Sequence, residues 1–289
     1  MRYKIRHLTH YRYSEAVTNS QHDLHLLPRD LPHQLCLSAE LEIRPAASVY
    51  QERLDYFGNR AAHVVLASPH SELAVIAHSH VAVTVPATIT PAQNVAWEAA
   101  VAQIAHDRGL LPVQEMTFPS PYIVPWNDLR AYARASFPAG QPVLEGCVDL
   151  MARVHGDFIY DAKATTIATP LDEVFSKRRG VCQDFSHLMI ACLRSLGLAA
   201  RYVSGYLVTT PPPGKMRLVG ADASHAWLAV YAPGLGFVDV DPTNNVLVGD
   251  QHITLAVGRD FGDVTPLRGV VLGGGRHELD VAVDVLPEE

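Results

Sequence analysis

Cys182 stands out in this sequence because of its position at the start of a predicted helix. Apolar side chains follow it at helical spacing over positions 185–196, and Gly197 is a plausible residue at which such a helix would end. The first turn of a helix carries partial positive charge and unpaired N–H groups, and both stabilise a thiolate. Cys182 is therefore a candidate nucleophile near neutral pH.

The other three cysteines give no comparable signal. A lone cysteine on a helix is more often a small core residue than a nucleophile. We interpret Cys36, Cys147 and Cys192 as core residues, since Cys192 lies on the apolar face of the same predicted helix. Four cysteines without a CxxC pair also do not form a disulfide framework. The assignment of Cys182 therefore depends on partners elsewhere in the chain.

His225 and Asp241 are the candidate partners. The alternation of residues predicts strands over 226–231 and 236–240, and a hairpin of these two strands would bring His225 and Asp241 to the same end. A cysteine–histidine pair needs a third polar group to orient the imidazole, and a carboxylate can do this. Asp239 lies on the same strand face as Asp241 and is the alternative carboxylate.

The composition excludes several classes of protein. The 289 residues are 48% hydrophobic and carry a net charge of −7, and the largest basic run is only 177–179. A nucleic-acid partner and binding to an anionic membrane are therefore not expected. The first residues, MRYKIRHLTHYRYS, lack the apolar region of a signal peptide, and no stretch is apolar enough to span a bilayer. We expect a cytoplasmic protein; the pattern indicates no particular oligomeric state.

The elements that must position these residues fall into three regions of an α+β chain. Residues 1–86 alternate in the manner of half-buried strands and predict an N-terminal β-sandwich domain. Residues 87–157 contain alanine-rich runs that predict a helical linking segment. Residues 158–289 would form the catalytic core, with the C-terminal strands arranged as a last pair around Gly273, Gly274 and Gly275.

Three segments resemble the conserved blocks of the transglutaminase-like superfamily: 179–186 (RGVCQDFS), 224–227 (SHAW) and 241–244 (DPTN). Residues 11–13 (YRY) and 25–29 (HLLPR) are similar to the start of the N-terminal β domain in its bacterial cysteine peptidase branch. Residues 258–261 (GRDF) and 263–264 (DV) resemble the C-terminal segment of that branch. The resemblance therefore covers nearly the whole chain.

The resemblance implies a papain-like core in which a helix bearing the nucleophile packs on an antiparallel sheet. By position it implies that Cys182 is the nucleophile, His225 the general base and acid, and Asp241 the orienting carboxylate. It favours Asp241 over Asp239 for the third role. We expect peptide or protein substrates, cleaved through an acyl-enzyme by water; an amine-transferring cross-linking enzyme and a non-catalytic binding module are the alternatives.

Around this core, two aromatic residues are candidates for substrate binding. Trp227 shares a strand face with His225, and Tyr160 lies in a short strand-like run before the nucleophile. The backbone N–H of Cys182 is the natural first oxyanion donor, and Tyr160 is a candidate for the second. Asp184, in the first helical turn, is expected to satisfy N–H groups there.

No cofactor or metal is expected. Of the fifteen histidines, the pairs His22–His25 and His78–His80 lack further ligands at standard spacing. A zinc site of Cys182, His187 and His225 explains fewer residues than the cysteine–histidine–aspartate arrangement. The calcium loop common in cross-linking enzymes is not recognisable in the sequence.

Overall fold

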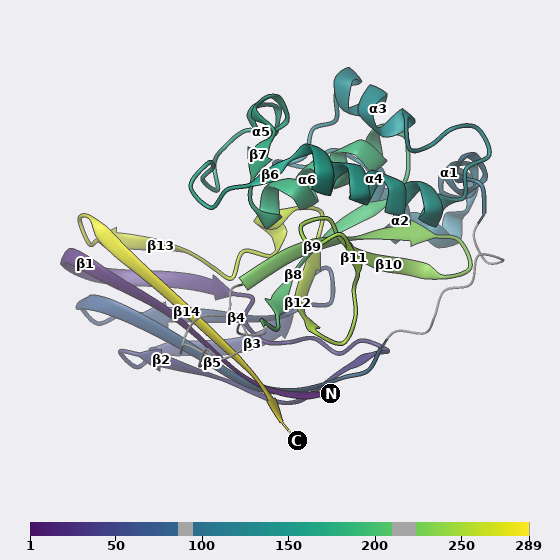
Figure 1. Cartoon of the computed structure of the whole chain (residues 1–289). Coiled ribbons are helices and arrows are strands. Elements are labelled where there is room, and N and C mark those ends of the chain that lie inside the picture. Colours follow the sequence, from purple (N-terminus) through teal and green to yellow (C-terminus); the bar gives the residue numbers. More distant parts are fainter. Residues whose placement is uncertain (86–94, 210–223, 289) are drawn as a thin grey trace, which may run out of the picture.

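A computed structural model describes residues 1–85, 95–209 and 224–288. A curled antiparallel sheet formed by both ends of the chain lies on one side, and the helices with a second sheet lie on the other (Figure 1). The boundary expected after residue 86 falls outside the described residues. None of the helices in the described ranges has the length and apolar character needed to cross a membrane.

The chain begins with strands, continues mainly with helices and ends with strands. The strands of the curled sheet are β1 (Arg2–Leu24), β2 (Gln34–Arg44), β3 (Val49–Leu54), β4 (Arg60–Leu66), β5 (His70–Val83), β13 (Leu267–Gly273) and β14 (His277–Glu288). The helices are α1 (Trp97–His106), α2 (Leu111–Gln114), α3 (Asn127–Arg134), α4 (Val143–Asp157), α5 (Leu171–Lys177) and α6 (Cys182–Ser195). The remaining strands are β6 (Ile159–Tyr160), β7 (Arg179–Gly180), β8 (Ala200–Leu207), β9 (Ser224–Ala232), β10 (Gly236–Asp241), β11 (Val246–Leu247) and β12 (His252–Gly258).

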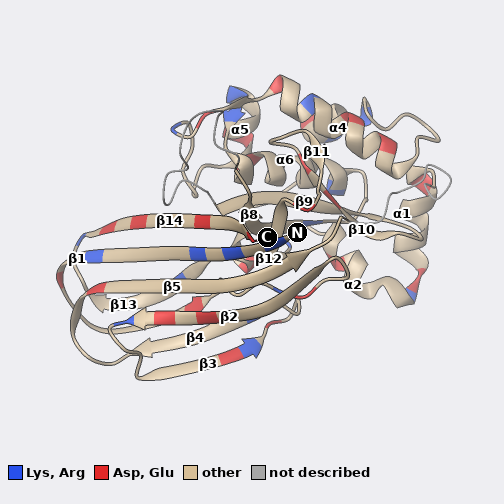
Figure 2. Ribbon diagram, turned by 60° about the horizontal axis from the view of Figure 1, so that its bottom comes forward, with Lys and Arg blue, Asp and Glu red and all other residues tan. Residues whose placement is uncertain are grey.

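The long strand β1 is the centre of the curled sheet. Its first half pairs with β5 on one side and β14 on the other, and its second half pairs with β4 and β13. Charge supports this register, because Arg2, Arg6 and Arg12 lie opposite acidic residues of β14. Figure 2 shows the basic residues of β1 beside the acidic residues of β14.

The two halves of this sheet pack on each other. Leucine, valine and alanine side chains of β1, β4 and β5 form a separate buried cluster between them. A single sheet that bends back on itself therefore takes the place of the two sheets of a sandwich. The bend lies on either side of Val17, because the register of β1 with β5 shifts between Arg12 and Val17 and its register with β13 shifts between Val17 and Asn19.

The C-terminal strands follow one another along β1 and pair with it, so they lie in the N-terminal sheet and not in the sheet of the catalytic core, with which the sequence analysis grouped them. Gly273, Gly274 and Gly275 form the bend between them, with positive φ angles of 93°, 87° and 60°. At all three a Cβ would meet the opposing bend of β1 within 3 Å. Glycine is needed here because other residues tolerate neither the φ angles nor the approach.

Helix α6 is the centre of the catalytic core and packs on a sheet of order β11-β10-β9-β8-β12. The apolar stripe predicted after Cys182 is confirmed, since all of its residues are buried. Gly197 has φ +87°, and its N–H bonds the carbonyl of Arg194, as expected where a helix ends. The rest of the helix from Asp184 to Arg194 is buried as well, because α6 packs against other helices in addition to the sheet.

The turn between β3 and β4 also connects the two parts of the molecule. Gly58 adopts φ +73°, and Asn59 is fully buried. The Asn59 side chain donates to the Val257 carbonyl and accepts from the Val257 N–H, both at 2.8 Å. The Asn59 side chain thus pairs with the backbone of β12 as a neighbouring strand would, and it anchors the curled sheet to the sheet that contains β12.

Gly205, on β8, allows its neighbours an unusually close approach. A Cβ there would lie well inside van der Waals contact of the Ile253 carbonyl and the Trp227 ring. We predict that Gly205→Ala lowers the free energy of unfolding by about 1–3 kcal/mol or more, the usual cost of overpacking a core. Chemical denaturation would measure it.

Gly156→Ala is the matched control for that substitution. Gly156 lies in α4, and no atom lies within 4 Å of a Cβ built there. Alanine should leave the stability unchanged or raise it by up to about 1 kcal/mol. Equal effects of the two substitutions would contradict the packing role of Gly205.

Candidate active site

Cys182 is the first residue of α6, and the turn before it is held by Asp184. The Asp184 carboxylate accepts the Val181 N–H at 2.8 Å and the Thr165 hydroxyl at 2.7 Å, which confirms the expected capping role. Gly180 makes this possible, because a Cβ there would lie 2.7 Å from the carboxylate. The Cys182 thiol is half-buried and free. It is therefore accessible, at the positive end of a helix.

His225, near the start of β9, brings two elements of the site together. Its Nε2 lies 2.7 Å from the Asp241 carboxylate, and the Cys182 side chain lies within hydrogen-bond reach of the imidazole. Burial alone would lower the pKa of His225, but the hydrogen bonds to Asp241 and Cys182 outweigh it and raise the pKa to about 9. The histidine is thus held as an imidazolium at neutral pH.

The raised pKa of His225 has a consequence for stability. The free histidine has a pKa of 6.5, so the contacts of His225 stabilise the folded chain fully below about pH 6.5. This contribution is lost as the pH rises through about 9, because the folded state then no longer holds the extra proton.

Asp241 is fully buried and accepts hydrogen bonds from several directions. Its Oδ2 lies near His225, the Asn244 side chain at 2.7 Å and His252 Nε2 at 3.2 Å. Its Oδ1 accepts the N–H groups of Thr243 and Asn244. Burial opposes the charge, but these bonds, first of all that to His225, hold the pKa of Asp241 well below its usual range.

The alternative carboxylate has another partner. Asp239 accepts the indole N–H of Trp227 at 3.1 Å, and burial raises the pKa of its carboxyl. The hydrogen bond to His225 thus comes from Asp241 and not from Asp239. The predicted neighbours Cys182, His225 and Asp241 are brought together by the structure.

The two predicted aromatic residues lie in different settings. Trp227 is fully buried, with its ring centroid 6.0 Å from that of His225 and 5.2 Å from that of His252. Its ring packs against both imidazoles, and because the side chain is fully buried it cannot contact a substrate. Tyr160 is 56% exposed, on the strand beside Gly180. Burial first and the charge of Cys182 second raise the pKa of Tyr160. Because Tyr160 pairs with Gly180, two residues before Cys182, its backbone lies beside the start of α6.

His252 and Asn244 are site residues that the sequence analysis missed. Asn244 is the last residue of the segment DPTN, so the sequence could have suggested a role for it in the site. His252 begins β12, which is not a neighbour of β10 in the sheet, yet its imidazole reaches Asp241. No spacing in the sequence indicates this contact, because it depends on the curl of the sheet.

Two histidines and an aspartate of this site could also hold a metal ion. Within residues 1–85, 95–209 and 224–288, the group with ligand atoms close enough is His225, Asp241 and His252, within 4.8 Å of one another. His187 is not part of it, since its Nε2 accepts the Phe261 N–H at 3.1 Å. Burial lowers the pKa of His187 to about 4, so it is a neutral core histidine.

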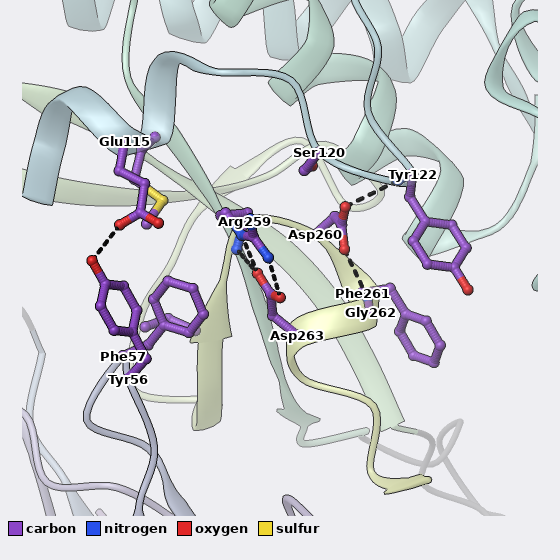
Figure 3. Close-up of polar contacts among 12 residues, drawn as sticks. Tyr56, Phe57, Glu115, Ser120, Tyr122, Arg259, Asp260, Phe261, Gly262 and Asp263 are labelled. Carbon is purple, nitrogen blue, oxygen red and sulfur yellow. Dashed lines mark hydrogen bonds and ion pairs between the residues drawn. The ribbon is translucent and has the colours of Figure 1, made fainter.

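The segment after β12 holds the loop before α3 against the core (Figure 3). Asp260 accepts the N–H of Tyr122 at 3.0 Å and that of Gly262 at 2.8 Å. Arg259 binds Asp263 through both carboxylate oxygens. This segment resembles the C-terminal segment of the family, and its contacts are structural. They hold the Tyr122 ring stacked against the His187 ring.

The chain is similar to known proteins over most of its length. Residues 3–82 match the model of the bacterial transglutaminase-like N-terminal region, and residues 130–242 match that of the transglutaminase-like superfamily. An uncharacterized protein of Mycobacterium tuberculosis is 41% identical over 298 residues, which cover 100% of this chain and 93% of that protein.

Two further proteins are similar over different extents. The crystal structure of a "Putative Cysteine Protease from Cytophaga hutchinsonii" superposes with a TM-score of 0.78 at 21% identity, covering 100% of this chain and 92% of that one. A protein-glutamine gamma-glutamyltransferase of Pseudomonas aeruginosa is 36% identical over 95 residues, 32% of this chain and 14% of that protein. The α+β fold with a transglutaminase-like core is confirmed, and the chain belongs to the transglutaminase-like superfamily, with a bacterial transglutaminase-like N-terminal region.

Proposed function

We propose that this protein is a thiol hydrolase that cleaves peptide or isopeptide bonds through an acyl-enzyme on Cys182. The observation that carries the proposal is the position of His225, in contact with the thiol on one side and with Asp241 on the other. That arrangement supplies a nucleophile, a proton carrier and an orienting carboxylate.

The chemical steps follow from these contacts. The Cys182 thiolate attacks the carbonyl carbon of the amide, and the His225 imidazolium gives its proton to the nitrogen as the carbon–nitrogen bond breaks. Water then attacks the thioester while His225 takes its proton, and the acid leaves with the thiolate restored. The backbone N–H of Cys182 can stabilise the oxyanion in both steps, because a residue at the start of a helix has no intrahelical acceptor for it.

The buried carboxylate fixes the imidazole for both steps. Asp241 stays ionised, and its bond to Nε2 leaves the other ring nitrogen, Nδ1, for the sulfur. His252 and Asn244 hold the same carboxylate from other sides and so act as positioning residues. Tyr160, exposed beside the thiol, is the aromatic residue best placed to contact a substrate.

Amine transfer is the second candidate, because the Pseudomonas aeruginosa relative is named a protein-glutamine gamma-glutamyltransferase. The two reactions share the acyl-enzyme and differ in whether water or an amine resolves it. We favour hydrolysis because water needs no binding site of its own to reach a half-buried thiol, whereas transfer needs a second site that holds the amine.

The first prediction concerns the reactivity of the thiol. Iodoacetamide at pH 7 should label Cys182 quickly, because the imidazolium of His225 and the helix N-terminus stabilise the thiolate. The rate, followed by peptide mass spectrometry, should fall at least about tenfold in His225→Ala. Cys147 and Cys192, whose thiols have pKa values raised to about 12 by burial, are internal controls. A Cys182 rate no higher than that of Cys36 would refute an activated thiolate.

The second prediction concerns pH. Activity should decline on the alkaline side near pH 9, as His225 loses the proton that it must give to the leaving group. Asp241→Asn removes the strongest contact that raises the pKa of His225, so the alkaline decline should move to lower pH and kcat/KM should fall by up to about 10⁴-fold. Asp239→Asn should leave the decline near pH 9. The same shift in both variants would contradict the role assigned to Asp241.

The third prediction separates hydrolysis from transfer. With p-nitrophenyl acetate, the protein should release nitrophenol in a burst and carry an acetyl group on Cys182, and Cys182→Ala should do neither. Adding a fluorescent primary amine should give little acetylated amine relative to acetate. Amide as the main product, or incorporation of the amine into a glutamine-bearing protein, would establish transfer instead.

A further inference from the structure

A cavity lies between the N-terminal part of the chain and the sheet of β8, β10 and β12. It has a volume of about 610 Å³. Apolar side chains from both parts of the chain line most of it, including Leu31, Leu235, Phe237 and Val248. Apart from His33, its ionisable side chains are Arg201 and Asp239. The proposed chemistry at Cys182 uses neither of them.

Arg201 is a cation without a hydrogen-bond partner. Its guanidinium lies over the Phe237 ring, 4.1 Å from the centroid, and donates no hydrogen bond to any residue of the described ranges. Its Nε is buried and unpaired. Burial lowers the pKa of Arg201 to about 10. A desolvated donor without an acceptor is costly, so an anionic group that enters the cavity would gain the bonds that the protein does not supply.

Asp239 and Arg201 lie in register with each other on two strands that flank β9. Arg201 on β8 and Asp239 on β10 both pair with Ala229 on the strand between them. Their Cα atoms are therefore two strand spacings apart, roughly 9–10 Å. Their side chains point to the same face, because both residues pair with Ala229, and both line the cavity. No salt bridge joins the two groups within the part of the chain that the structure describes.

We propose that this cavity binds a small apolar zwitterion, a free amino acid or a dipeptide, with its carboxylate on Arg201 and its ammonium group on Asp239. A positive and a negative side chain on either side of a small residue match the two charges of such a ligand. The apolar walls accommodate an aliphatic side chain, and the volume is sufficient for either size.

The cavity also has a physical connection to the catalytic residues. The Asp239 carboxylate accepts the indole N–H of Trp227, and the Trp227 ring packs against His225 and His252. A ligand ammonium group on Asp239 would share that carboxylate with the indole. The site is distinct from the thiol, since none of Cys182, His225 and Asp241 lines it.

Calorimetry on the Cys182→Ala protein tests the proposal without dependence on catalysis. L-leucine or L-leucyl-L-leucine should bind and raise the melting temperature. Isoamylamine and 4-methylpentanoate, which each carry one of the two charges, should bind at least tenfold more weakly. Binding of either single-charge analogue as tightly as both zwitterions, or no binding of the zwitterions, would overturn the proposal.

Variants locate the binding. Arg201→Met and Asp239→Asn should each weaken zwitterion binding at least tenfold, and Arg108→Met, which removes an exposed arginine outside the cavity, should not. If Arg201→Met does not fold, as judged by circular dichroism, Asp239→Asn and the ligand series still decide. Unchanged affinity in Asp239→Asn would refute the site even if catalysis at Cys182 proved correct.

Discussion

A fully buried carboxylate, that of Asp241, constrains the arrangement of the catalytic half of this molecule. A charge in that position is tolerated only when hydrogen-bond donors surround it. The donors come from the start of β9, the turn after β10 and the start of β12. Three segments must therefore meet at one end of the sheet, and α6 must lie across that end for its first residue to reach His225.

The residues that do the proposed chemistry could be predicted because their signal is local. A helical stripe places Cys182 at a helix start, and two short strands place His225 and Asp241 at one end of a hairpin. His252 could not be predicted in this way. It reaches Asp241 from a strand that is three places away in the sheet. That contact depends on curvature, which residue alternation does not specify.

The same limit explains the N-terminal sheet. Alternation identifies its strands, but alternation is the same in a flat sheet, a sandwich and a curled sheet. The bend is set by local features whose effect depends on the opposite strand, such as Gly273, Gly274 and Gly275 against β1. The pairing of β13 and β14 with β1 could not be predicted from the residues of each segment alone. The charges of β1 and β14 are nevertheless complementary in the observed register.

That pairing has a consequence for how the chain folds during synthesis. β1 is made long before β14, the strand that covers one of its sides. Until β14 emerges from the ribosome, a long strand with alternating apolar residues has an open edge, the kind of surface that promotes aggregation. Contacts this distant in sequence also form slowly. The sheet that β1 organises is therefore complete only after the last strand of the chain has been made.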